Sequence, residues 1–196
     1  MTVKRYPWHG FPSLIIHAEE RGVKSHSSYT AAKAGEPASA FDLVRNMVSE
    51  KCLAQLCELH SDQKPILVSA HAVEYSGVNA IPQAMAEYLG SRLRWPVESL
   101  IVQTNVVGHT GADGFSRLAR QAEFDGAVSE NACYVLVDDF IGQGGTLANL
   151  RGFLLHCGAR VIGGTVLTGK PYSAMLSSDE QQIVHLLEIH GPDLET

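Results

Sequence analysis

Four short apolar runs alternate with helical stretches over the second half of the chain, and this alternation restricts the possible folds more than any other feature of the sequence. The apolar runs cover residues 66–69, 100–103, 134–137 and 161–168. Apolar residues recur at helical spacing in 79–89 and in 146–157. Buried strands that are separated by helices pair in parallel, because the crossover helix returns the chain to the same end of the sheet. We therefore predict an α/β fold with a parallel sheet and helices on both of its faces.

The first forty residues show no such alternation. Residues 1–38 are rich in His, Pro, Gly and Ser, so we expect an irregular arm with one strand at 14–17. From Ser39 onward apolar residues return at steps of three and four, which predicts an amphipathic helix with Ser39 as its N-cap. They are Phe41, Val44, Val48, Cys52, Leu56 and Leu59. A chain of 196 residues is long enough for one core, so we expect a single domain, 1–196.

The composition argues against several classes of protein. The sequence has 15 Lys and Arg against 21 Asp and Glu, and the net charge of −6 is not that of a protein that coats nucleic acid or an anionic membrane. No segment reaches about 18 consecutive apolar residues, and the N-terminus lacks the apolar run of a signal peptide. The 4 cysteines form no CxxC pair, so free thiols are expected. We therefore expect a cytoplasmic protein without a nucleic-acid or membrane partner.

The most informative stretch is 134–147, with the sequence YVLVDDFIGQGGTL. Two adjacent carboxylates, Asp138 and Asp139, follow an apolar strand, and a pair of glycines precedes a helix that opens at Thr146. Glycines allow backbone amides to approach an anion, and a helix N-terminus favours negative charge, so the loop suits a phosphate monoester. Paired carboxylates suit a vicinal diol or Mg²⁺. A tight turn with capping aspartates is the alternative, but the combination favours a ribose 5-phosphate site.

The stretch VLVDDFIGQGGTL resembles the phosphoribosyl pyrophosphate (PRPP) motif of the type I phosphoribosyltransferases. The resemblance extends over 65–170 and implies that family's fold, a parallel sheet flanked by helices with a small variable hood. It identifies 65–170 as the PRPP-binding core of a bacterial-type, stand-alone member. It also implies that Asp138 and Asp139 hold the ribose hydroxyls and Mg²⁺. The 5′-phosphate would bind at Gly142, Gln143, Gly144, Gly145 and Thr146.

Two positions depart from the family's pattern. Gln143 stands where Thr or Ser is common, and Gly142 stands where the 6-oxopurine enzymes usually carry an aspartate that handles a proton of the base. The second departure argues against a hypoxanthine-type mechanism.

A second loop, 69–77, should bind pyrophosphate, because ligands of open parallel sheets lie beyond the carboxyl ends of the strands. The resemblance implies that small residues such as Ala70 present backbone amides there. His71 either donates to a phosphate or packs at the strand end. Glu74 would repel pyrophosphate unless Mg²⁺ lies between them or the side chain turns away, so we expect it in the site as an acid, a base or a metal ligand.

The segment 105–131 is long for a loop inside a compact domain, which is typical of a functional lid. Arg117 and Arg120 are its candidate phosphate ligands, and the alternative is a solvated helical turn. His109 either lines the closed site or lies on the surface. Lys170 follows the last strand, where some purine phosphoribosyltransferases place a lysine that contacts the base, although such a lysine is often solvated.

The expected reaction transfers ribose 5-phosphate from Mg²⁺-bound PRPP to a nucleobase or a related nitrogen acceptor, with release of pyrophosphate. Two alternatives remain open: a PRPP- or nucleotide-binding sensor without transferase activity, and a hydrolase that cleaves a nucleotide's N-glycosidic bond. The acceptor would be recognised by a hood from 1–60 or 171–196, and we expect a homodimer.

Overall fold

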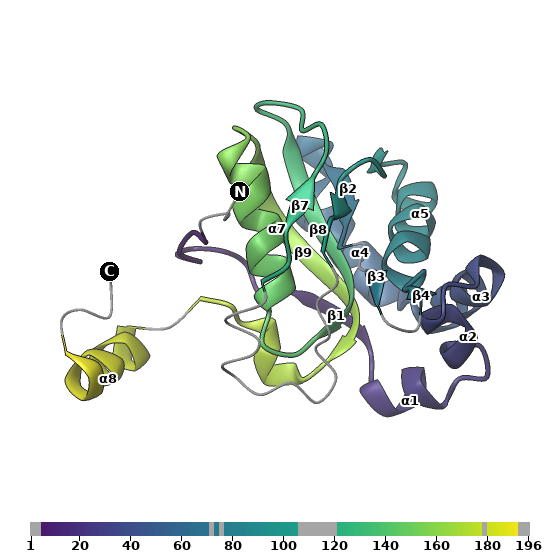
Figure 1. Cartoon of the computed structure of the whole chain (residues 1–196), viewed down its shortest axis with the longest axis horizontal. Coiled ribbons are helices and arrows are strands. Elements are labelled where there is room, and N and C mark those ends of the chain that lie inside the picture. The colour runs from purple at the N-terminus through teal and green to yellow at the C-terminus, as the bar shows by residue number, and fades with distance from the viewer. Residues whose placement is uncertain (1–4, 71–72, 75–76, 106–120, 178–179, 192–196) are drawn as a thin grey trace.

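The computed structural model describes residues 5–70, 73–74, 77–105, 121–177 and 180–191. A five-stranded, wholly parallel sheet forms its centre, with the strand order β1-β9-β8-β2-β5 (Figure 1). Its strands are β1 (Ile15–Ala18), β2 (Ile66–Ser69), β5 (Val97–Glu98), β8 (Cys133–Ile141) and β9 (Arg160–Gly169). The predicted α/β class with a parallel sheet is confirmed.

Helices cover both faces of the sheet, as predicted (Figure 1). One face packs against α1 (Glu20–Ser25), α2 (Tyr29–Lys33), α3 (Pro37–Met47), α4 (Glu50–His60) and α5 (Ile81–Leu93). The other face packs against α7 (Gly145–His156). Because side chains alternate along a strand, Val135 and Val137 of β8 lie in the first core and Leu136 lies in the second.

Shorter elements lie outside the central sheet. Two small antiparallel sheets pair β3 (Val73–Glu74) with β4 (Gly77–Val78), and β6 (Val102–Gln103) with β7 (Phe124–Asp125). The remaining elements are η1 (Ser61–Gln63), η2 (Pro171–Ala174) and α8 (Glu180–His190). None of the helices in the described ranges combines the length and apolar character needed to cross a bilayer.

The prediction of a sheet strand at 100–103 is wrong. The central sheet ends at β5, three residues earlier in the chain, and β6 pairs with β7 instead. The Glu98 carboxylate accepts a hydrogen bond of 2.8 Å from the backbone N–H of Leu100, which turns the chain away from the sheet. Gly126 then lies so close to this turn that a β-carbon on it would be 2.5 Å from the Leu100 carbonyl oxygen. The apolar run 100–103 therefore contributes to the local antiparallel pair of β6 and β7 and not to the central sheet.

The irregular arm expected at 1–38 is also not what the structure shows. It contains β1, which pairs with β9 at the edge of the central sheet, followed by α1 and α2. Val23 of α1 and Ala32 of α2 are completely buried against the core. Each helix spans only one or two turns and buries one residue, so neither produces an apolar period in the sequence.

The single helix predicted from Ser39 is two helices, α3 and α4. The helix begins earlier, because Glu36 is the N-cap of α3 and its carboxylate accepts the amide protons of Ala38 and Ser39. It ends at Val48, and the next amide, that of Ser49, donates to Nδ1 of a buried histidine on β1. A tertiary contact therefore interrupts a continuous apolar stripe.

Candidate functional site

The paired aspartates lie where the topology of the sheet reverses. The connection after β2 runs through α5 on one face, and the connection after β8 runs through α7 on the other. Crevices for ligands in open parallel sheets form at such a point, beyond the carboxyl ends of the strands. Strand β2 ends at Ser69, opposite Val137, whereas β8 continues through Asp138 and Asp139. The two aspartates therefore lie inside β8, just past the end of its neighbour, and not after the strand as expected.

Alternation along β8 starts the two side chains on opposite faces of the strand, but their carboxyl groups remain close enough for Asp139 to raise the pKa of Asp138. Asp138 lies opposite Val166 of β9, a residue of the core under α7. Asp139 reaches the other face, where its Oδ2 lies 3.0 Å from the Nζ of Lys33 at the end of α2. The backbone N–H of Asp139 donates a 2.8 Å hydrogen bond to Oδ1 of Asp138. A lysine from the first forty residues thus becomes part of the site.

Burial dominates the electrostatics of this pair. Asp138 is 8% exposed and Asp139 is 9% exposed. Burial raises the pKa of Asp138 well above its usual range, and the neighbouring charge of Asp139 raises it further, while Lys33 opposes the shift. If both carboxyl groups were ionised, the site would carry one more negative charge than Lys33 compensates, and this imbalance favours the protonated form of Asp138. A ligand that brings hydroxyl donors or a cation would relieve this imbalance.

The loop after β8 has the geometry of an anion site. Gly144 adopts φ 73°, in the left-handed region that favours glycine, and α7 starts at Gly145 with no side chain capping its N-terminus. The first amides of a helix have no intrahelical acceptor and carry positive potential. The five residues assigned to the phosphate are all at least partly accessible to solvent. They are Gly142, Gln143, Gly144, Gly145 and Thr146.

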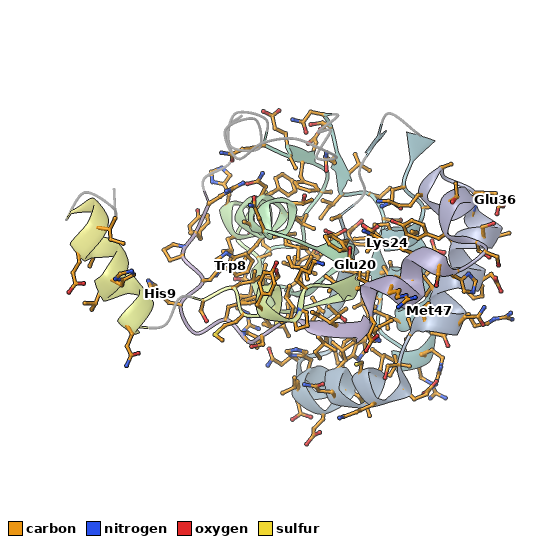
Figure 2. The ribbon with its side chains drawn as sticks, turned by 90° about the horizontal axis from the view of Figure 1, so that it is seen from below. Trp8, His9, Glu20, Lys24, Glu36 and Met47 are labelled. Carbon is orange, nitrogen blue, oxygen red and sulfur yellow. The ribbon has the colours of Figure 1, made fainter. Side chains whose placement is uncertain are left out.

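An open pocket lies across the ends of β1 and β9. Its lining comprises Glu19, Glu20, Arg21, Lys24, Ser25, Gly169, Lys170 and Pro171. The structure places Lys170 here, with its Nζ 2.7 Å from a carboxylate oxygen of Glu20. Glu20 also pairs with Lys24 at 2.6 Å, and Figure 2 shows these two side chains close together. Phe140, the residue after the aspartate pair, has its ring centroid 5.5 Å from the Lys24 ammonium.

The hydrogen bonds of the two lysines set the charge state of this pocket. They lower the pKa of the Glu20 carboxyl to about 2, and Glu20 in turn raises the pKa of Lys170. Within the pocket, Glu20 therefore stays a carboxylate between the ammonium groups of Lys24 and Lys170. Sequence reasoning found Lys170 but missed Glu20 and Lys24, whose i,i+4 spacing was the available signal.

The second predicted loop is described in part. Ala70 is buried, and its backbone N–H donates a hydrogen bond of 2.9 Å to the Val137 carbonyl oxygen. This bond extends the hydrogen-bonded pairing of β2 and β8 by one residue. The expectation that this amide binds pyrophosphate is therefore corrected, because the amide is already used. The backbone of Glu74 lies in β3, but its side chain lies outside what the structure describes, as does all of His71.

The predicted lid is described only at its two ends. Asn105 and the segment 121–123 lie together. The side-chain Nδ2 of Asn105 donates a hydrogen bond of 2.7 Å to the Gln121 carbonyl oxygen, and its Oδ1 accepts one of 2.9 Å from the backbone N–H of Glu123. The lid candidates Arg117, Arg120 and His109 lie outside the described residues. Their assigned roles stay predictions.

Metal binding is compatible with the donor set of the aspartates. Among the described residues, no three His, Cys, Asp or Glu side chains are grouped as a closed metal site. Mg²⁺ does not need such a group, since it commonly binds one or two carboxylates and takes its remaining ligands from substrate phosphates and water. Asp138 and Asp139 fit that requirement because they supply two adjacent carboxyl groups at the carboxyl end of the sheet.

Two curated proteins are similar to the chain in sequence, while no family model matches it. Protein TraN of Escherichia coli is 36% identical over 192 residues, which are 98% of this chain and 43% of that protein. An uncharacterised protein of Haemophilus influenzae is 37% identical over 145 residues, 74% of this chain and 32% of that protein. The chain therefore spans less than half the length of each of these relatives.

Solved structures show a distant likeness. The purine phosphoribosyltransferase of Pyrococcus horikoshii matches with a TM-score of 0.43 and 18% identity, covering 66% of this chain and 78% of that one. An adenine phosphoribosyltransferase matches with a TM-score of 0.45 and 12% identity, covering 90% of this chain and 92% of that one. Scores this low, at identities this small, carry no argument about activity.

Proposed function

We propose that this chain binds Mg²⁺-PRPP and transfers its ribose 5-phosphate group to a nucleobase or a related nitrogen acceptor, releasing pyrophosphate. One observation carries the proposal. A buried pair of carboxylates and a glycine-opened, uncapped helix N-terminus follow each other within a few residues at the switch point of a parallel sheet. A ribose with a 5′-phosphate has a diol for the first feature and a dianion for the second.

The aspartates would bind the sugar through its hydroxyls. Each ribose hydroxyl donates one hydrogen bond, and a charge-assisted bond of this kind is stronger than a neutral one. Asp138 and Asp139 would also be the protein ligands of Mg²⁺, which supplies positive charge to the pyrophosphate when it is bound. The phosphate end would lie at Gly144 and Gly145, where the first amides of α7 point out of the helix.

The chemical step proposed is displacement at the anomeric carbon. The acceptor nitrogen forms a bond to this carbon as the bond to pyrophosphate breaks, and the pair of bonding electrons leaves with the pyrophosphate oxygen. Positive charge develops on the sugar ring in the transition state, so buried carboxylates held in place by β8 stabilise it without reorganising. Lys33 orients Asp139 through their 3.0 Å ion pair.

The pocket beside β9 is the proposed acceptor site. The ring centroid of Phe140, the residue after the aspartate pair, lies 5.5 Å from the ammonium of its lining residue Lys24. The pocket's charged lining residues are Glu19, Glu20, Arg21, Lys24 and Lys170, of which Glu20 pairs with both lysines. A carboxylate between two ammonium groups can accept from a ring N–H while the lysines donate to ring oxygens. This charge pattern favours an acceptor with both donor and acceptor groups on one edge, as nucleobases have.

A sensor that binds PRPP without turnover is the second candidate. The occupied Ala70 amide favours it, because that amide cannot contribute to a pyrophosphate site. The departures at Gly142 and Gln143 support it as well. Glu74 fits either candidate, and its proposed effect, a steep dependence of PRPP binding on Mg²⁺, stays a prediction.

Labelled PRPP separates the candidates. The purified chain is incubated with Mg²⁺, PRPP labelled in the ribose, and single nucleobases in turn, and pyrophosphate and labelled nucleotide are measured together. Equal release of both with one base supports the transferase. PRPP binding without either product supports the sensor, and base release from a nucleotide without PRPP supports the hydrolase. A chain that does not bind PRPP contradicts the proposal.

A further inference from the structure

An arginine from the start of the described chain lies at the same helix N-terminus. Arg5 donates a hydrogen bond of 2.7 Å from Nε to Oδ1 of Asn149, a residue of α7 that is 2% exposed. One of its terminal nitrogens, Nη2, lies 3.4 Å from the position that a β-carbon on Gly145 would occupy. Gly145 is the first residue of α7. The guanidinium group therefore lies against the opening turn of the helix.

Several contacts hold the N-terminal segment 5–11, called the arm below, in this position. Arg151, also on α7, donates from Nη1 to the carbonyl oxygens of Tyr6 at 3.0 Å and Pro7 at 3.1 Å. Its guanidinium carbon lies 4.5 Å from the ring centroid of Trp8, which Figure 2 labels. Trp8 in turn packs edge-on against Phe11, which is buried in the core beneath α7. The arm is thus fastened along the helix just after Arg5.

The electrostatics of this arrangement are unfavourable without a ligand. A helix N-terminus carries positive potential, so a cation beside it is repelled, and no side chain caps α7. In the described parts of the chain, Arg5 forms no ion pair with a carboxylate, and partial burial lowers its pKa. Two independent groups of donors, the helix amides and the guanidinium, converge on one place. An anion between them would satisfy both.

We infer that Arg5 is a phosphate-binding residue: its guanidinium closes the α7 end of the site over the 5′-phosphate of the bound ribose 5-phosphate. This inference rests on the proposed function and adds to it a residue of the arm. Asn149 is the positioning residue, because it holds Nε and leaves the terminal nitrogens for the ligand. The 5′-phosphate then has amide donors from the loop and two donors from the arginine fork.

Calorimetry with two probes tests the inference. Ribose 5-phosphate and ribose are titrated into the parent chain, Arg5→Gln and Arg5→Lys. Arg45→Gln is the matched control, because Arg45 is exposed on α3 and its substitution removes the same charge. We expect Arg5→Gln to weaken ribose 5-phosphate binding by about tenfold or more and to leave ribose binding unchanged, since only the phosphorylated probe meets the guanidinium. The affinity of Arg5→Lys for ribose 5-phosphate should lie between those of the parent and Arg5→Gln, and the affinity of Arg45→Gln should match that of the parent.

The outcomes are distinct. If the parent binds ribose 5-phosphate and Arg5→Gln binds it equally well, the inference is wrong and the proposed function stands. An equal loss for both sugars means that the arm only supports the fold, and this also overturns the inference. If the parent binds neither ribose 5-phosphate nor Mg²⁺-PRPP, the proposed function fails and takes the inference with it. A parent that binds Mg²⁺-PRPP but not ribose 5-phosphate overturns the inference alone. Thermal unfolding of each variant shows whether the arm remains docked.

Discussion

The ammonium of Lys33 lies 3.0 Å from Oδ2 of Asp139, so the end of α2 is joined to the end of β8 across 106 positions of sequence. Both side chains are mostly buried. We predict that Lys33→Met destabilises the fold by roughly 1 to 2 kcal/mol, because it leaves Asp139 without its cation. In an Asp139→Asn background, Lys33→Met should lower the free energy of unfolding clearly less. Chemical denaturation of the four proteins of this double-mutant cycle measures the coupling, and additive effects would contradict the ion pair's role.

Asp138→Asn should stabilise the protein at neutral pH by about 1 kcal/mol. The pKa of Asp138 is raised in the folded state, so folding disfavours its charged form, and stability falls as pH rises through that pKa. An amide has no charge to bury, while its oxygen still accepts the Asp139 N–H. The gain should disappear at acid pH, where the carboxyl is protonated. Urea denaturation against pH measures it, with the exposed Asp62→Asn as control; an equal gain at every pH would show that charge burial is not the cause.

His17 on β1 should make stability depend on pH between about 6.5 and 4. Its Nδ1 accepts from the Ser49 amide at 3.2 Å, so Nε2 carries the proton and donates to Thr165 at 3.0 Å. Burial lowers the pKa of His17 to about 4. The unfolded chain therefore binds the proton more readily, and stability that is complete above the unfolded pKa is lost as pH falls, by roughly 3 kcal/mol in all.

The variant His17→Gln checks this dependence. It should flatten the decline in unfolding free energy between pH 7 and 4, whereas His9→Gln, at an exposed position, should keep the parent's profile. If both variants decline as the parent does, the acid sensitivity has another origin.

Three of the strongly apolar elements could be predicted from the sequence almost to the residue, whereas β8 extends four residues past its predicted end at Val137. Strand β2 has the predicted bounds, and α7 and β9 differ from them by one residue at each end. Their residues are buried on both sides or along a continuous stripe, so burial leaves a clear pattern in the sequence. Strand β5 has two residues, both partly exposed, and gives no such pattern.

The residues of the candidate site also fall into two groups, those that a local sequence pattern predicts and those that it does not. The acidic pair and the glycine loop are adjacent in sequence, so their chemistry could be predicted together. Lys33, Glu20 and Arg5 come from the first forty residues and reach the site only through tertiary contacts. No local pattern distinguishes a lysine that pairs with a distant aspartate from one that is solvated.

Binding of Mg²⁺-PRPP to the parent chain and to the Asp138→Asn, Asp139→Asn double variant tests the central claim most directly. Calorimetry should show saturable, Mg²⁺-dependent binding to the parent. The double variant should bind at least about a hundredfold more weakly, because amides replace both charged acceptors of the diol and both ligands of the metal. Thermal unfolding should show that the variant is folded. Equal affinity of the two folded proteins for Mg²⁺-PRPP would contradict the assignment of this site.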